Sequence, residues 1–185
     1  DNGFAGTDTS LALNRPVQVA HISAMGDWAK DGKFIYAGRR NEGGANFRAG
    51  ECALFTESSA GYAGIKSEAE FDFDVRPLPY WKAVTDEPQN TIIGGASLWV
   101  MEGLEADEYK GVAEFMNFLS SPEIQAKWHQ DTGYVPITAS AAELTGEQGF
   151  YEANPGTDIA VIQMTAKAPT ENSKGLRLGS FDQIR

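Results

Sequence analysis

The chain has 185 residues, of which 42% are apolar and 11% aromatic, so it has enough apolar material to bury a core. Its 15 Lys and Arg residues against 26 Asp and Glu give a net charge of -11, which argues against a nucleic-acid backbone or an anionic membrane as a partner. An anionic small ligand is still compatible, because one well-placed arginine can outweigh a distant global field. The single cysteine, Cys52, excludes an internal disulfide and a multi-cysteine zinc cluster. No apolar run approaches the length of a membrane span, and the first residues lack the basic and apolar regions of a signal peptide.

The first predicted element is an amphipathic helix over residues 14–30. Asn14 followed by Pro16 is typical of a helix start, and apolar residues recur at helical spacing from Val17 to Trp28. The glycine of "KDGKF" ends the pattern. We expect the apolar stripe of this helix to face the core.

Four later segments are predicted to be strands, with helices between them. The strands are "FIYAG" (34–38), "CALFT" (52–56), "FDFDV" (71–75) and "TIIGGASLWVM" (91–101). A short helix is predicted around "NFRAG" and another over "YAGIKSEAE". Strands alternating with helices indicate an α/β fold class.

The second half of the chain is predicted to be mainly helical. Residues 107–119 carry apolar residues at helical spacing, and Pro122 starts a further helix at a first-turn position. The remainder is predicted to form short helices broken at "NPG", "AP" and "KGLRLGS".

Nucleophilic catalysis is not favoured by this sequence. A serine or cysteine nucleophile needs a base beside it, and the two histidines, His21 and His129, both fall inside helix patterns, where surface or packing roles explain them. Cys52 lies in an apolar segment and is interpreted as a small buried hydrophobe. We therefore expect no catalytic residues and no enzymatic activity.

A metal or cofactor site is also not favoured. Asp72 and Asp74 would share a strand face, which suits a cation site or an acid/base pair, but a solvated strand face explains them as well. No further oxygen donor is in obvious reach, and the chain has no glycine loop of the phosphate-binding type. No metal and no cofactor are expected.

Several loops at element ends carry groups that bind small polar molecules. "ESSAG" offers the hydroxyls of Ser58 and Ser59, "IIGGAS" offers backbone N–H groups unshielded by side chains, and "TGYVP" offers a phenol. "RLGSFDQIR" adds Arg177 and Arg185. Each is an ordinary turn when taken alone, but their joint placement at the ends of α/β elements is typical of a ligand site.

The order of these motifs resembles a known family. "F-x-x-G-x-x-A" at Phe47 to Ala53, "SSAG", "LPY", "IIGGASLWVM", "FMNFLSSPE", "TGYVPI" and "GLRLG…QIR" are similar to the extracellular solute-binding proteins of bacterial ABC importers, and most similar to their glycerol-phosphate-binding branch. The resemblance spans nearly the whole chain. It implies a type II periplasmic-binding fold, in which two α/β lobes close on a ligand.

The resemblance also implies a domain organisation. Residues 1–80 and 135–185 would form the second lobe, and residues 81–134 would be a crossover and helical segment belonging to the first lobe. The rest of the first lobe, the signal peptide and the C-terminal helices would lie outside the chain, which would then be a fragment. We expect the helices of the crossover segment to be covered by a second copy of the fragment, swapped or docked, or to be poorly ordered.

Carried over by position, the implied ligand contacts fall on Ser58, Gly95, Tyr134 and Arg185. Further candidates are Ser59, Gly94 and Arg177. The implied function is capture of glycerol 3-phosphate or a glycerophosphodiester in the periplasm and delivery to the permease subunits in the membrane. Two alternatives stay open: a binding protein for a neutral oligosaccharide, and a carbohydrate-active hydrolase.

Overall fold

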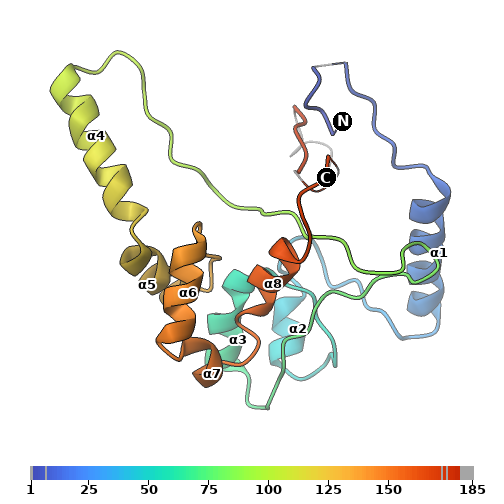
Figure 1. Cartoon of the computed structure of the whole chain (residues 1–185). Helices are drawn as coiled ribbons and strands as arrows, with labels where there is room; N and C mark the ends of the chain where they lie inside the picture. The colour runs from blue at the N-terminus through green and yellow to red at the C-terminus, as the bar shows by residue number, and fades with distance from the viewer. Residues whose placement is uncertain (1, 7, 172, 174, 180–185) are drawn as a thin grey trace. The chain divides into compact units, whose positions relative to one another are not determined.

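The computed structural model describes residues 2–6, 8–171, 173 and 175–179. Within these residues the chain forms eight α-helices and one short 3₁₀-helix, η1 (Figure 1). In chain order they are α1 (Pro16–Lys30), α2 (Gly44–Arg48), η1 (Ser59–Gly61), α3 (Tyr62–Glu68), α4 (Ala106–Leu119), α5 (Pro122–Thr132), α6 (Ala139–Glu147), α7 (Phe150–Ala153) and α8 (Ile159–Thr165).

The predicted helices are confirmed, with their ends set by local chemistry. Helix α5 has proline in its first turn, where the missing N–H costs nothing, and ends at Gly133 in the left-handed conformation. Helix α4 starts with a capping box, in which Glu105 accepts a backbone N–H and the Glu108 carboxylate accepts the Glu105 N–H at 2.8 Å. The short helices after residue 135 break before "NPG" and "AP", as predicted.

The four predicted strands are not confirmed, so the α/β class is not confirmed either. Residues 34–38, 52–56, 71–75 and 91–101 form no strand in the described part of the chain. Large apolar side chains of these segments are open to solvent: Leu54 of "CALFT" is 91% exposed and Trp99 is 86% exposed. A strand needs a neighbouring strand for its backbone hydrogen bonds, and none of these segments pairs with another within the described residues.

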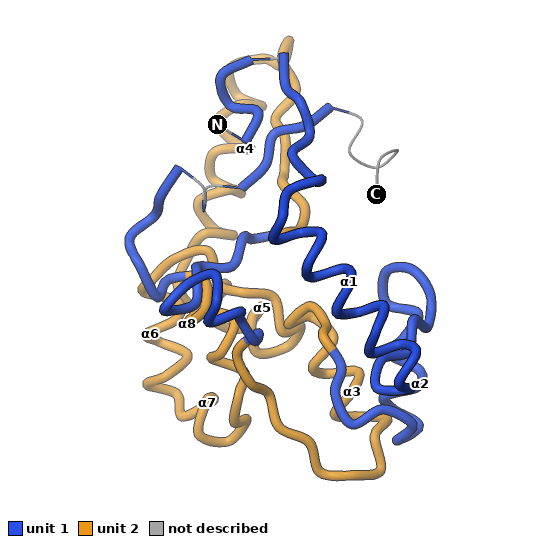
Figure 2. Tube along the Cα trace, turned by 90° about the vertical axis from the view of Figure 1, so that its right-hand side faces the viewer, with its two compact units in different colours: residues 1–55, 78–93, 165–185 blue, residues 56–77, 94–164 orange. Residues whose placement is uncertain are grey.

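The chain divides into two compact units (Figure 2). Unit 1 comprises residues 1–55, 78–93 and 165–185, and unit 2 comprises residues 56–77 and 94–164. The lobe assignment from the resemblance, 1–80 with 135–185, concerns a longer protein and stays a prediction.

Unit 1 is held together by an aromatic cluster and one amide pair. The rings of Trp28 and Trp81 stack at 6.1 Å, and the Trp81 indole N–H donates to His21 Nδ1 at 3.2 Å. The Asn90 side chain donates to the Lys167 carbonyl at 2.8 Å and accepts the Lys167 N–H at 2.9 Å. The prediction that α1 turns an apolar stripe toward the core is wrong, because no residue of this helix is buried.

Unit 2 contains the buried side chains of the described chain. Ala126 on α5 and Ala141 on α6 are 1% and 0% exposed, so small side chains let these two helices pack closely. His129 and Thr145 are 2% and 0% exposed in the same interface. The Thr145 hydroxyl donates to the Ala141 carbonyl at 2.8 Å, which satisfies its hydrogen within its own helix. Among the described residues, no helix is both long and apolar enough for a bilayer.

The tight contact between α5 and α6 predicts a size limit at Ala141. Replacing Ala141 with Leu should lower the free energy of unfolding by about 1 to 3 kcal/mol, because a fully buried methyl has no room for three more carbons. Ala139→Leu, at an exposed position of the same helix, is the matched control and should leave the urea midpoint nearly unchanged. Equal midpoints for the two variants would show that the α5–α6 packing is looser than described.

Candidate ligand-binding site

The C-terminal end of α5 is a turn that only glycine makes easily. Gly133 has φ +76°, and its N–H donates to the His129 carbonyl at 2.8 Å, which closes the last turn of the helix. A Cβ at this position would lie 2.6 Å from the carbonyl oxygen of Ser59. Glycine is thus required twice, once for the backbone conformation and once for the close approach of the Ser59 loop.

The residue after this turn, Tyr134, has both of its backbone groups held by α5 side chains. The Tyr134 N–H donates to Thr132 Oγ1 at 3.3 Å, and its carbonyl accepts a hydrogen bond from His129 Nδ1 at 2.7 Å. The side chain remains 51% exposed, and its hydroxyl makes no hydrogen bond with the described residues. The backbone is therefore fixed while the phenol stays available to a ligand.

The turn that approaches Gly133 contains the two predicted serines. Ser58 is the N-cap of η1, and its Oγ accepts the Ala60 N–H at 3.3 Å. Ser59 is half-buried and directs its carbonyl at Gly133, whereas Ser58 is exposed. The structure thus brings the Ser58–Ser59 turn into contact with the Gly133–Tyr134 turn, although the two turns are far apart in the sequence.

A carboxylate lies beside the serine turn. Glu57 Oε1 accepts the Ser58 N–H at 2.8 Å, and a Cβ on Gly61 would lie 2.5 Å from Glu57 Cγ, so the Glu57 side chain folds back over the turn. The turn therefore offers hydroxyls and a carboxylate. An anionic ligand at this place needs a positive charge from elsewhere.

The other predicted ligand residues are placed differently. Gly94 and Gly95 lie in an exposed extended segment of unit 2, where a Cβ would meet no atom within 4 Å. Gly95 nevertheless has φ +136°, which favours glycine. Arg177 lies in a loop of unit 1, where its N–H donates to the Asn2 carbonyl at 2.8 Å, and Arg185 lies outside the described residues.

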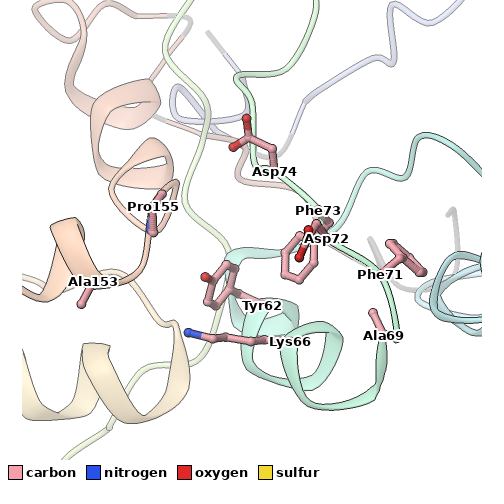
Figure 3. A pocket seen from close by; sticks show the side chains of 9 residues that line it. All are labelled: Tyr62, Lys66, Ala69, Phe71, Asp72, Phe73, Asp74, Ala153 and Pro155. Atoms are coloured by element: carbon pink, nitrogen blue, oxygen red, sulfur yellow. The ribbon is translucent and has the colours of Figure 1, made fainter.

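Unit 2 also has a pocket of about 370 Å³ that contains none of the predicted ligand residues (Figure 3). Its lining residues are Tyr62, Lys66, Ala69, Phe71, Asp72, Phe73, Asp74, Ala153 and Pro155. Lys66 Nζ donates to Asn154 Oδ1 at 2.7 Å and lies 5.8 Å from the centre of the Tyr62 ring.

The two aspartates of this pocket do not form a paired acid/base site. Asp74 pairs with Arg76 and also accepts the Val75 N–H at 2.8 Å, and both carboxylates are exposed. Exposure and these partners agree with the reading of the aspartates as a solvated face. The described residues hold no cluster of three His, Cys, Asp or Glu side chains that could bind a metal ion.

His129, which the sequence analysis assigned to a surface or packing role, lies next to the candidate site in the structure. Its ring lies between Phe150 and Tyr151 of α7, with ring centroids 5.9 and 5.7 Å away. Burial lowers the pKa of His129 from its ordinary value, while the hydrogen bond to the Tyr134 carbonyl acts in the opposite direction. A histidine in the last turn of a helix, four residues before a glycine, was the available sequence signal for this contact.

Comparison with known proteins identifies the family. The model of bacterial extracellular solute-binding proteins matches residues 2–158. The chain therefore belongs to this family. Membership agrees with the expectation of a binding protein, and the family supports a type II periplasmic-binding fold.

Individual relatives in this solute-binding family are similar over all 185 residues. The chain is 55% identical to the sn-glycerol-3-phosphate-binding periplasmic protein UgpB of Pectobacterium atrosepticum, and 54% and 52% identical to the proteins of the same name from Yersinia enterocolitica and Escherichia coli O1:K1. It spans 42% of the length of each relative.

The contact between the two turns can be tested at Gly133. Gly133→Ala should lower the free energy of unfolding by about 2 to 4 kcal/mol, because left-handed backbone strain of about 1 to 2 kcal/mol is joined by displacement of the Ser59 carbonyl. Gly149→Ala is a matched control, since Gly149 has φ +71° but open space around its Cβ position. Urea unfolding of both variants measures the difference, and equal losses would mean that the turns do not touch.

Proposed function

We propose that this chain is part of a periplasmic solute-binding protein that captures glycerol 3-phosphate or a glycerophosphodiester and delivers it to the membrane permease of an ABC importer. Identity of 52 to 55% over the whole chain to relatives named for binding sn-glycerol 3-phosphate in the periplasm supports this ligand and this compartment. The structural observation that carries the proposal is the contact between the Ser59 carbonyl and Gly133, which joins the two turns bearing Ser58 and Tyr134.

The chemistry of these turns suits capture and release. Ser58 supplies an adaptable hydroxyl, and Tyr134 supplies a rigid ring with a polar tip. His129, whose ring contacts the Tyr134 carbonyl, has its Nδ1 engaged with that carbonyl and its Nε2 buried. Within the described residues, no imidazole is therefore available to take the Ser58 proton in the manner of a Ser–His pair.

A negatively charged phosphate needs a positive charge in the site, which an arginine can supply. Because Glu57 already occupies the Ser58 N–H, the serine turn alone would repel an anion. We infer that Arg185 supplies the compensating charge, with a guanidinium that makes two parallel hydrogen bonds to phosphate oxygens, and that Arg177 is a secondary donor. Gly94 and Gly95 would add backbone N–H groups that no Cβ shields, and Ser59 would add a further hydroxyl.

The proposed architecture is the two-lobed α/β form of the type II periplasmic-binding fold. In it, residues 1–80 and 135–185 belong to the second lobe, and residues 81–134 cross to the first. The extended segments 34–38, 52–56, 71–75 and 91–101 would become strands when partner strands are available for their backbone groups.

A neutral oligosaccharide is the second candidate ligand, and Glu57 is the observation that favours it. A carboxylate beside a serine accepts hydrogen bonds from sugar hydroxyls, and an exposed aromatic ring stacks on the face of a sugar. Neither contact needs an arginine. In that case Arg185 would have a structural role only.

Calorimetry on the complete polypeptide that carries this segment separates the two ligands. Glycerol 3-phosphate should bind and maltose should not. Arg185→Ala should weaken glycerol 3-phosphate binding by about 2 to 4 kcal/mol, the scale for removing one partner of a desolvated charge pair. Arg185→Lys should recover only part of the loss, because a point charge replaces a two-pronged donor.

Two outcomes of that titration would overturn the proposal. Equal affinity of the wild type and Arg185→Ala for glycerol 3-phosphate would remove the arginine from the site and with it the phosphate ligand. Binding of maltose in place of glycerol 3-phosphate would establish the neutral oligosaccharide, and turnover of a chromogenic glycoside would establish a hydrolase.

We also propose that α4 is covered by a second copy when the 185-residue chain is studied by itself. Phe115 and Phe118 on α4 are 54% and 55% exposed, and Trp128 on α5 is 56% exposed. An apolar face of this kind usually belongs to an interface.

The exposed apolar side chains of α4 predict that the chain self-associates through this helix. Sedimentation equilibrium should show a dimer, and Phe115→Ser with Phe118→Ser should shift it to monomer because the buried apolar area is lost. Leu54→Ser in unit 1, also highly exposed, is the control and should not change the dimer. A wild-type monomer at all concentrations would contradict the expectation, as would an equal effect of Leu54→Ser.

A further inference from the structure

The imidazole of His129 links a buried cage to the candidate site. The ring is 2% exposed, and its Nδ1 donates to the Tyr134 carbonyl at 2.7 Å, which fixes the tautomer with hydrogen on Nδ1 because a carbonyl can only accept. Nε2 then has a lone pair, and it is buried without a hydrogen-bond partner among the described residues. Among the described residues, the Tyr151 hydroxyl is the other buried side-chain polar atom without a hydrogen-bond partner.

From these contacts we propose that His129 is the positioning residue of the ligand site: its neutral ring sets the place of Tyr134, and protonation of the ring releases Tyr134 and weakens ligand binding. The inference rests on the proposed function, because it takes Tyr134 to be a ligand contact. It adds a regulation of that same site by acid.

Protonation acts through the cage and not through the hydrogen bond to Tyr134. A charged ring would keep the Nδ1 donor, and that bond by itself favours the charged form. The proton would, however, sit on Nε2, where it would be a buried donor without an acceptor and would carry a charge between the Phe150 and Tyr151 rings. Burial is the larger of the two effects on the pKa, so the charged ring is disfavoured inside the cage. The unpaired Nε2–H between the two aromatic rings would drive the protonated ring toward water, and the Nδ1 contact would be lost with it.

Within the part of the chain that the structure describes, no neighbouring charge stabilises the protonated ring. Tyr151 is the titratable group that faces it, and burial raises the pKa of Tyr151, an effect that the half-buried Asp158 strengthens and the nearby Thr145 hydroxyl opposes, so this phenol stays neutral in acid. Thr145 donates its own hydrogen to Ala141 and is not within hydrogen-bond geometry of Tyr151. The other charged side chains of α5, α6 and α7 are exposed: Glu123, Lys127, Asp131, Glu143, Glu147 and Glu152.

The direction of the pH effect follows from the lowered pKa. Because the folded-state pKa of His129 lies below its unfolded value of 6.5, the neutral ring contributes its stability above pH 6.5. That contribution is lost as the pH falls through the lower folded-state pKa. The site should therefore be fully formed at pH 7.5 and weakened in acid.

Three variants separate positioning from packing. His129→Asn keeps an amide donor near the place of Nδ1 and has no proton to gain, whereas His129→Leu fills the cage and leaves the Tyr134 carbonyl without its donor. His21→Asn, at the exposed second histidine on α1, controls for histidine titration elsewhere in the described chain.

The test is calorimetry of glycerol 3-phosphate binding to the complete polypeptide at pH 7.5, 6.5 and 5.0. At a pH about one unit below the His129 midpoint measured by nuclear magnetic resonance, the wild type and His21→Asn should each have lost about tenfold more affinity, relative to pH 7.5, than His129→Asn. The phosphate of the ligand itself titrates with a second pKa near 6. Dividing each affinity by that of His129→Asn at the same pH cancels this contribution. His129→Leu should bind weakly at every pH, with the same pH dependence as His129→Asn.

Parallel pH profiles of the wild type and His129→Asn would overturn the proposal. A loss of wild-type affinity that occurs only together with unfolding, followed by circular dichroism, would also overturn it, because His129 would then serve stability alone.

A second readout keeps the test decisive if the variants fail to fold or no ligand binds. In protein labelled at histidine and tyrosine, nuclear magnetic resonance should show the Nδ1–H tautomer of His129 at pH 7.5, and the Tyr134 signals should move with the midpoint of His129 protonation. Tyr134 signals that ignore that midpoint would overturn the positioning role. If the Tyr134 signals follow the His129 midpoint but glycerol 3-phosphate does not bind, the positioning role is retained and the proposed ligand is rejected.

Discussion

The hydrogen bond from His129 to the Tyr134 carbonyl fixes the path of the chain as it leaves α5, and the candidate site depends on that path. A carbonyl just beyond a helix end needs a donor if it is shielded from water, and the imidazole supplies one from the last turn of the same helix. Gly133 makes the bond geometrically possible, because its left-handed backbone turns the chain back within one residue. The same turn leaves room for the Ser59 carbonyl, so one glycine determines both the helix end and the contact between the two turns that carry candidate ligand residues.

The close packing of α5 on α6 explains why His129 can be buried at all. With only small side chains between the helices at Ala126 and Ala141, the remaining space is filled by the imidazole and the rings of α7. Neutral histidine suits this position, since it combines an apolar ring face for the cage with one donor for the carbonyl. A leucine would fill the space without the donor, and a lysine would bring a charge that the cage cannot solvate.

A chain with a net charge of -11 is an unexpected host for a phosphate ligand, and Glu57 places a further carboxylate beside the serine turn. Charge effects over distances beyond about 10 Å are largely screened by salt, so the local arrangement decides the affinity. The proposed site thus combines a fixed tyrosine, a serine turn and an arginine that must overcome one nearby carboxylate. That requirement also favours a ligand with two or more negative oxygens over one with a single charge.

The sequence by itself determined the helices and the residue types of the site. Proline at the first turn and glycine after the last turn define α5 through local backbone chemistry, and Ser58 and Tyr134 were found from the motifs that resemble the solute-binding family. The strands were not obtained, because "CALFT" and "TIIGGASLWVM" have strand-like composition but a strand exists only with a partner whose backbone groups it can bond. The contacts of His129 were also beyond the sequence: its spacing from Gly133 indicates a helix end, but only the tertiary structure places its ring against Phe150 and Tyr151 and its Nδ1 on the Tyr134 carbonyl. Burial and contact between distant turns are properties of packing, and no local pattern contains them.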